Sequence, residues 1–224
     1  MAAPLPPLVD RTPTTPPRHR VRATRPAGRR TRSLLLDAAT LLFADRGLQD
    51  VSLTEIAAEA DAFPSQVTYY FGSKEALFVE AACREVLHLG ERVERAARPA
   101  RTRAEYARLI ARTALASPAL LTFAEALLLA RQRPGLAPLV DRALQRLHSE
   151  GARAWEERCQ AREWSVDAPP EAVARGFWAI VLGLVLERAG SSKAFDHATA
   201  EAAVVATLSA RYSSTMTETR PRRS

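Results

Sequence analysis

Apolar side chains recur every three or four residues from about position 35 to position 212, as in Leu35, Ala38, Leu42 and later Phe78 and Ala82. This spacing gathers apolar side chains on one face of a helix. No stretch shows the strict alternation of apolar and polar residues that a half-buried strand requires. The pattern therefore predicts an all-α protein with about nine helices.

Breaks in the periodicity divide these helices. Gly47 ends the first helix, which carries the apolar stripe from Leu35 onwards. Ser52, with Glu55 three residues later, forms a capping box that begins a second helix. A short third helix covers residues 65–70, and Ser73 caps a fourth. The remaining helices are expected at about 102–116, 118–133, 137–163, 169–189 and 196–212.

The net charge of +7 is concentrated at the N-terminus. Residues 1–32 contain eight arginines and one acid, whereas bases and acids balance over the rest of the chain. Residues 1–28 also contain seven of the 15 prolines, which predicts a disordered arm. A local excess of positive charge fits a polyanionic partner, and a solvated tail without a partner is the equal alternative.

Several functional classes lack their usual sequence signals. Cys83 and Cys159 form no CxxC pair, so neither a disulfide framework nor a metal site is expected. The four histidines are scattered and no glycine-rich phosphate loop occurs, so we expect no cofactor and no enzymatic activity. No signal peptide and no apolar run of about 18 residues is present, which predicts a soluble cytoplasmic protein.

Residues 52–75 have the pattern of a helix-turn-helix. Ile56 and Ala57 face inward from the first short helix, and small residues fill the turn. Val67 is the expected inward anchor of the second helix. The opposite face of this helix is polar and is formed by Ser65, Gln66, Thr68, Tyr69 and Tyr70.

This segment resembles the TetR family of bacterial transcription regulators. The family pattern maps without a gap from Ser52 to Leu77, and the likeness extends over residues 29–82. The sequence departs from the pattern at Asp61 (usually Gly), Phe63-Pro64 (Ser-x), Ser65 (Gly), Thr68 (Tyr) and Tyr70 (His).

The resemblance implies that the third helix enters the major groove of DNA. The residues expected nearest the bases are Pro64, Ser65 and Gln66, and Gln66 is a candidate for bidentate pairing with adenine. Phosphate contacts are implied for Ser52, Thr54, Thr68, Tyr69, Tyr70 and Lys74, and minor-groove contacts for Arg25, Arg29 and Arg30. The alternatives are that Tyr69 and Tyr70 pack in the core, that Gln66 is a surface residue without a partner, and that the arm does not contact DNA.

The resemblance also implies a ligand-binding and dimer-forming body. The last two helices are expected to pair with their copies, so that a homodimer binds a palindromic double-stranded operator. A small-molecule effector would bind among the middle helices and lower operator affinity, as in a repressor. An activating or ligand-independent role is the alternative. The candidate pocket residues, each of which is more commonly plain core, are Tyr106, Phe123, Glu125, His148, Trp155 and Trp178.

Together these features divide the chain into four parts. Residues 1–28 form the disordered basic arm, 29–76 the helix-turn-helix domain, 77–212 the ligand-binding and dimerisation domain, and 213–224 a disordered tail. Two rival functions remain open. One is a helical protein without enzymatic activity that binds membranes or nucleic acid non-specifically through its basic arm, and the other is an all-α enzyme.

Overall fold

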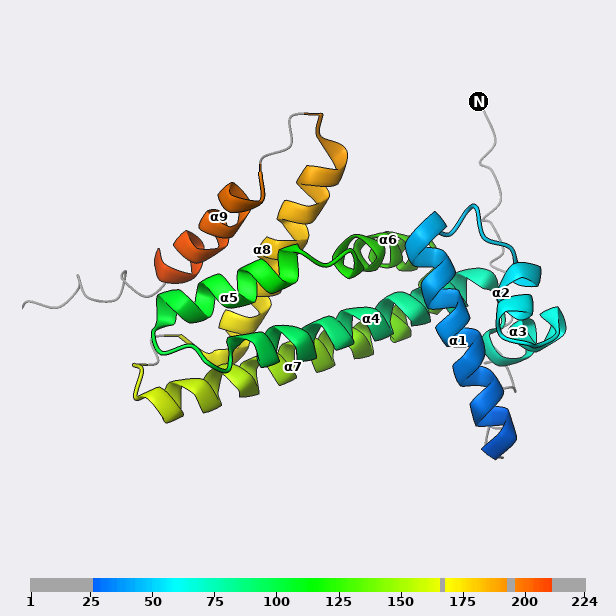
Figure 1. Cartoon of the computed structure of the whole chain (residues 1–224), viewed down its shortest axis with the longest axis horizontal. Helices are drawn as coiled ribbons and strands as arrows, with labels where there is room; N and C mark the ends of the chain where they lie inside the picture. The colour runs from blue at the N-terminus through cyan, green and yellow to red at the C-terminus, as the bar shows by residue number, and fades with distance from the viewer. Residues whose placement is uncertain (1–25, 166–167, 193–195, 211–224) are drawn as a thin grey trace, which may run out of the picture.

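The computed structural model describes residues 26–165, 168–192 and 196–210, and all the regular secondary structure in these ranges is helical (Figure 1). A head at one end contains α1 (Pro26–Arg46), α2 (Leu53–Glu59) and α3 (Pro64–Phe71). The body contains α4 (Lys74–Ala97), α5 (Arg103–Leu115), α6 (Ala119–Gln132), the short turn η2 (Pro134–Leu136), α7 (Ala137–Arg162), α8 (Pro170–Gly190) and α9 (His197–Ala210). The prediction of an all-α fold with about nine helices is confirmed for these residues.

The predicted caps form as hydrogen bonds. The backbone N–H of Glu55 donates to Ser52 Oγ at 3.1 Å, and the N–H of Ser52 donates to Glu55 Oε2 at 2.8 Å. The N–H of Ala76 donates to Ser73 Oγ at 3.1 Å at the start of α4. These bonds satisfy backbone donors that a helix leaves unpaired in its first turn.

The boundary between the arm and the first helix differs from the predicted one. α1 begins at Pro26, so residues 26–28, which we assigned to the arm, form its first turn. Proline is well tolerated there because the first-turn N–H groups have no partner within the helix. α9 is described as far as Ala210, and the predicted arm up to residue 25, positions 211–212 and the predicted tail 213–224 lie outside the described residues.

α4 runs from the head into the body and contributes to both cores (Figure 1). Near its start, Phe78 is 1% exposed and meets Phe43 of α1 edge to face, with ring centroids 5.2 Å apart. Further along, its buried face packs against α5, α6 and α7. The predicted apolar stripe on this helix is buried throughout, at Phe78, Ala82, Val86, Leu89 and Val93.

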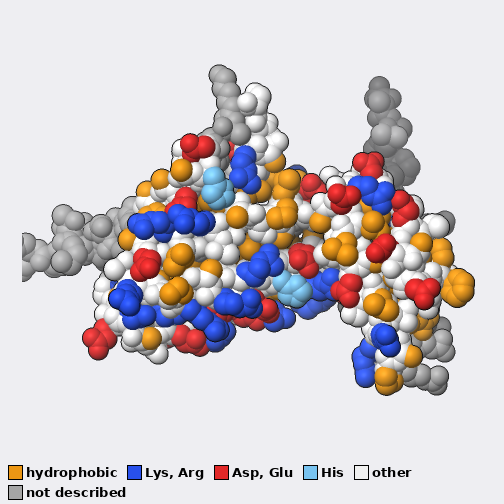
Figure 2. All heavy atoms as spheres, viewed as in Figure 1, with side chains coloured by type: hydrophobic (Ala, Val, Ile, Leu, Met, Phe, Trp, Pro, Cys, Tyr) orange, Lys and Arg blue, Asp and Glu red, His pale blue; other side chains and the backbone are white. Residues whose placement is uncertain are grey.

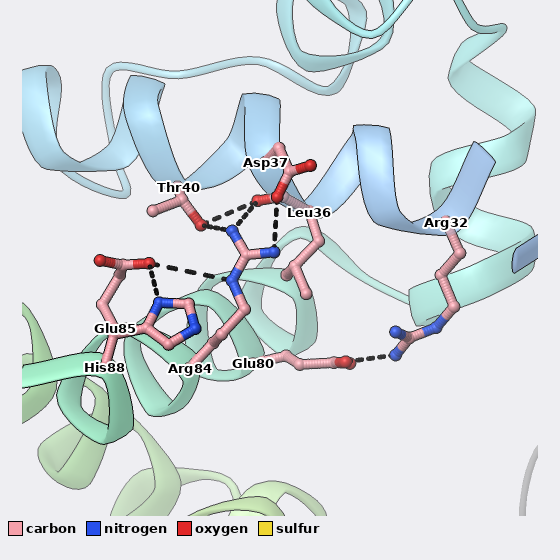
Figure 3. A network of polar contacts seen from close by, with 8 residues as sticks. All are labelled: Arg32, Leu36, Asp37, Thr40, Glu80, Arg84, Glu85 and His88. Carbon is pink, nitrogen blue, oxygen red and sulfur yellow. Dashed lines mark hydrogen bonds and ion pairs between the residues drawn. The ribbon is translucent and has the colours of Figure 1, made fainter. Parts of the chain in front are cut away.

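Polar contacts fix α1 across α4 (Figure 3). The guanidinium of Arg84 donates to Asp37 Oδ1 at 2.7 Å, to Thr40 Oγ1 at 2.8 Å and to the carbonyl oxygen of Leu36 at 3.3 Å. One helical turn earlier on α4, Glu80 forms an ion pair with Arg32 of α1. Because a guanidinium presents its donors in a fixed fork, these bonds also fix the angle between the two helices.

None of the described helices is by itself long and apolar enough to span a membrane. By length and composition, only α5 and α6 taken together would reach such a length, and they meet at an angle of 68°.

Candidate nucleic-acid interface and ligand cavity

α3 has one buried face and one accessible face. Val67 is fully buried and Phe71 is 9% exposed, and both pack into the core of the head. This confirms Val67 as the inward anchor of the helix. The opposite face contains Pro64, Ser65 and Thr68, which are exposed. A helix of this kind can offer polar side chains to a partner while its own position is held by apolar packing.

The turn before α3 contains a left-handed residue. Asp61 has φ +48°, a conformation that short polar residues such as Asp adopt more readily than bulky ones. The N–H of Ala62 then bonds back to the carbonyl of Ala57 at 2.8 Å. This geometry explains why aspartate can replace the glycine that is usual at this position.

The side chain of Gln66 caps its own helix. The backbone N–H of Phe63 donates to Gln66 Oε1 at 2.9 Å. Bidentate pairing with adenine uses both the oxygen and the nitrogen of the amide. In such pairing Gln66 Oε1 would have to accept a second hydrogen bond, in addition to the one from Phe63.

Phe63 is a surface residue that the sequence analysis did not select. It immediately precedes α3, and its residue surface is 75% exposed. The available signal was the departure from the family pattern, because a large apolar residue stands where a small polar one is usual. Its position makes it a neighbour of the predicted base-contacting residues.

The predicted phosphate-contacting residues lie around α2, α3 and the start of α4. The rings of Tyr69 and Tyr70 meet edge to face with centroids 5.0 Å apart, and Tyr70 is packed partly against the core. Lys74 Nζ donates to the carbonyl oxygen of Val51 at 2.9 Å, which uses one of the three donors of its ammonium group. Ser52 and Thr54 are exposed on α2.

The arginines predicted to reach the minor groove are only partly covered by the structure. Arg29 and Arg30 are exposed in the first turns of α1, whereas Arg25 lies outside the described residues. On the face seen in Figure 2, acidic, basic and apolar side chains are mixed over the head. This face of the described head therefore has no uniform basic surface.

Glu55 is the most strongly perturbed carboxylate of the head. The Ser52 hydroxyl, the Ser52 backbone N–H and the Arg46 guanidinium stabilise its charged form and lower its pKa from 4.5 to about 2. Arg46 Nη1 lies 2.8 Å from Glu55 Oε1. The carboxylate therefore caps α2 and also links it to the end of α1.

Glu55→Gln is expected to reduce stability near neutral pH and to have less effect in acid. A group whose pKa is lowered on folding contributes stability above its unfolded pKa, and that contribution disappears as the pH falls through the folded value. The difference in unfolding free energy between wild type and variant should shrink between about pH 5 and pH 2. Urea unfolding at several pH values measures this, and a difference that grows on acidification would contradict it.

The body contains a cavity of about 270 Å³ between α4, α5, α7 and α8, and Leu208 of α9 also lines it. Three of the six predicted ligand residues line it, namely Tyr106, Trp155 and Trp178. The other three do not. Phe123 is fully buried elsewhere in the core, Glu125 is exposed on α6, and His148 is partly buried on α7, where desolvation lowers its pKa.

Aromatic rings form much of the cavity wall. The rings of Tyr106 and Trp155 lie 5.4 Å apart, and those of Phe177 and Trp178 lie 5.0 Å apart. The charged residues Glu94, Arg103 and Glu150 also line the cavity. Large apolar surfaces with a few charged groups are typical of sites for small organic molecules.

Two glycines allow the helices around the cavity to approach closely. A Cβ atom at Gly90 would lie 3.0 Å from Leu147 Cδ1, and one at Gly151 would lie 3.2 Å from the Cβ of Ala174. Both glycines line the cavity. Its shape therefore depends on these two contacts as well as on the aromatic rings.

The charged groups of the cavity have partners at its rim. Glu150 Oε1 lies 2.7 Å from Arg146 Nε, and Glu94 Oε2 lies 3.9 Å from Arg153 Nη2. The guanidinium of Arg103 donates to Ser165 Oγ at 3.0 Å. Within the described ranges, no group of three His, Cys, Asp or Glu side chains is placed to hold a metal ion.

Two family models match the chain. Residues 35–81 match the model of bacterial regulatory proteins of the tetR family, and residues 103–207 match that of the bacterial transcriptional repressor C-terminal domain. A search of curated protein sequences finds no match.

Solved structures share the fold. A predicted transcriptional regulator from Rhodococcus sp. RHA1 is 35% identical with a TM-score of 0.70, and the match covers 81% of this chain and 95% of that one. A predicted TetR-family regulator from Mesorhizobium loti is 20% identical with a TM-score of 0.64, covering 84% and 96%. FadR of Thermus thermophilus, a TetR-family repressor solved with lauroyl-CoA, is 23% identical with a TM-score of 0.61, covering 86% and 99%.

Proposed function

Since the chain belongs to the TetR family of bacterial transcriptional regulators, we propose that it is a cytoplasmic repressor that binds a palindromic operator as a homodimer and is released by a small-molecule effector. The observation that carries the proposal is α3, which exposes a polar face while Val67 and Phe71 anchor it. In this proposal residues 29–76 bind DNA, and residues 77–212 bind the effector and the partner subunit.

The proposed DNA contacts fall into three groups. Pro64, Ser65 and Gln66 lie at the start of α3, where side chains reach base edges when such a helix enters the major groove. Phosphate contacts come from Ser52, Thr54, Thr68, Tyr69, Tyr70 and Lys74. Arg29 and Arg30 at the start of α1, and Arg25 just before it in the sequence, add positive charge, which steepens the dependence of affinity on salt concentration.

The proposed dimer interface is formed by α8 and α9. The outward face of α8 exposes Ala179, Gly183 and Leu186, so two small residues stand beside an apolar one. Small residues let two helices approach closely, and a two-fold interface presents the same surface on both subunits. The two copies of α3 would then face successive major grooves about 34–36 Å apart.

Gly183→Arg is expected to weaken the dimer, with a dissociation constant at least about 100-fold higher. Each subunit of a two-fold dimer would bury one unpaired arginine in the interface. No atom outside its own helix neighbourhood lies within 4 Å of a Cβ built at Gly183, so the protomer should keep its fold. Analytical ultracentrifugation measures the association. The matched control is Ala161→Arg, on the exposed surface of α7. A Gly183→Arg protein that remains as dimeric as this control would place the interface elsewhere.

The proposed effector is an apolar or amphipathic small molecule that binds in the body cavity against Tyr106, Trp155 and Trp178. The precedent of lauroyl-CoA bound to FadR of T. thermophilus supports an amphipathic ligand. α4 provides the link to DNA, because it lines the cavity with Gly90, Val93 and Glu94 and begins three residues after α3 ends. An effector that binds more tightly to a dimer whose two heads are wrongly spaced for the operator stabilises that state. Operator affinity then falls by an amount set by the difference between the effector's affinities for the two states.

Selection of bound duplexes from a random DNA library tests the proposal. We expect an enriched inverted repeat, and a small-molecule panel should then yield a compound that releases it. Recovery of random sequence, together with vesicle binding that survives Gln66→Ala and Tyr69→Ala, would favour a basic non-specific binder instead. Conversion of the releasing compound into a product would show that the body is an enzyme.

A further inference from the structure

Phe63 is the most exposed large apolar residue of the described chain, at 75%, ahead of Leu41 at 67% and Leu128 at 52%. It occupies the N-cap position of α3, with φ −91° and ψ 144°, and its side chain makes no capping hydrogen bond. Its ring is therefore not needed to begin the helix. It stands beside Pro64 and Ser65, which are also exposed and which the proposed function places nearest the bases.

Gln66 presents a donor at the same end of α3. Its Oε1 accepts the hydrogen bond from the N–H of Phe63, as described above. No hydrogen bond from its Nε2 is found among the described residues, and the side chain is half-buried. One of the two lone pairs of its oxygen is engaged in this bond, so the N–H groups of Gln66 are more available to a partner than its oxygen.

We propose that Phe63 and Gln66 together read thymine in the major groove. There thymine presents an O4 acceptor and a C5-methyl group, which match an amide donor and an apolar ring. Adenine would need both a donor and an acceptor from Gln66, and cytosine offers a donor in place of O4. The proposal rests on the proposed operator binding and specifies which base the start of α3 prefers.

Base analogues test the two contacts separately in the full-length wild-type protein. In an operator recovered by selection, uracil in place of thymine removes only the methyl group. Affinity should fall about fourfold for each half-site, and so about 15-fold for the two half-sites of a dimer, if the methyl is buried against Phe63. A 5-methylcytosine·guanine pair keeps the methyl group but replaces O4 with a donor, and should bind more weakly still.

Phe63→Ala should bind the thymine and uracil duplexes with equal affinity, because the ring that contacts the methyl group is absent. The matched control is Leu41→Ala, which removes an exposed apolar side chain from α1 in the same domain and should keep the wild-type discrimination. Because the Phe63 side chain does not cap α3, both variants should melt at the wild-type temperature.

Gln66→Glu tests the donor. A glutamate at this position still accepts from the N–H of Phe63 but has no N–H to give. Its preference should move from thymine towards cytosine, whose N4 is a donor. The ratio of the two affinities is the readout, because the added negative charge weakens binding to every duplex alike.

Each outcome decides one question. If wild type binds its operator but treats thymine and uracil alike at every position, the thymine inference is wrong and the operator proposal stands. If no duplex is preferred over any other, the proposed function itself fails. If Phe63→Ala abolishes dimerisation instead of the methyl preference, Phe63 contacts a second copy of the chain and not DNA.

Discussion

Phe78→Ala is expected to lower the free energy of unfolding by about 3–5 kcal/mol, because it removes a fully buried aromatic ring and leaves a cavity. Phe78 is 1% exposed and meets Phe43 edge to face at 5.2 Å, a geometry that adds to the stability gained from burial. It lies where α4 enters the core of the head, so the loss should weaken the support of α3 as well.

Urea unfolding at one fixed protein concentration measures this effect, since dimerisation makes apparent stability depend on concentration. Leu128→Ala is the control, because Leu128 is 52% exposed on α6 and its loss should change stability by about 0.5 kcal/mol or less. A loss below about 1 kcal/mol for Phe78→Ala would mean that the α1–α4 core is not packed as described.

Ala154→Phe is expected to lower effector affinity at least about 100-fold while leaving operator binding intact. Ala154 is half-buried on α7 and lines the cavity of about 270 Å³, so a phenyl ring there would occupy the volume that the effector needs. Overpacking can cost about 1–3 kcal/mol of stability, which the dimer should tolerate. The measurement is the concentration of the releasing compound that frees half of the bound operator.

Ala161→Phe is the matched control for the cavity substitution. Ala161 lies seven residues further along the same helix, is exposed and does not line the cavity. It should respond to the compound as wild type does. If the compound releases Ala154→Phe from the operator at the same concentration as wild type, the effector binds somewhere else.

The architecture followed from local rules that the sequence displays. Apolar spacing gives the helices, and Ser52, Glu55 and Ser73 mark two helix starts through hydrogen bonds that depend only on neighbouring residues. Val67 was also predictable from local sequence. α3 has eight residues and is too short to bury more than one face, and Val67 is its only aliphatic residue apart from Pro64.

The details of the DNA-binding face depend on contacts that periodicity does not reveal. The bond between the N–H of Phe63 and Gln66 is a local cap, and it uses one lone pair of the oxygen that pairing with adenine would need. Lys74 bonds the carbonyl oxygen of Val51, 23 residues earlier, because the start of α4 lies beside the loop before α2. Only the Lys74 contact arises from the packing of separate segments.

The cavity was only partly predictable for a related reason. Helical periodicity identifies inward-facing residues but does not say which of them border empty space. Phe123 faces inward and is fully buried in the core, whereas Tyr106 and Trp155 border the cavity. The difference depends on how closely α7 approaches α4 at Gly90 and α8 at Gly151.

The central claim is that the outward face of α3 distinguishes one DNA sequence from another. The direct test compares the affinity of the purified protein for a selected duplex with its affinity for a scrambled duplex of the same composition at about 150 mM salt. We expect a ratio of at least about 10³, as is typical of sequence-specific regulators. A ratio near one, with or without candidate effectors, would contradict the claim.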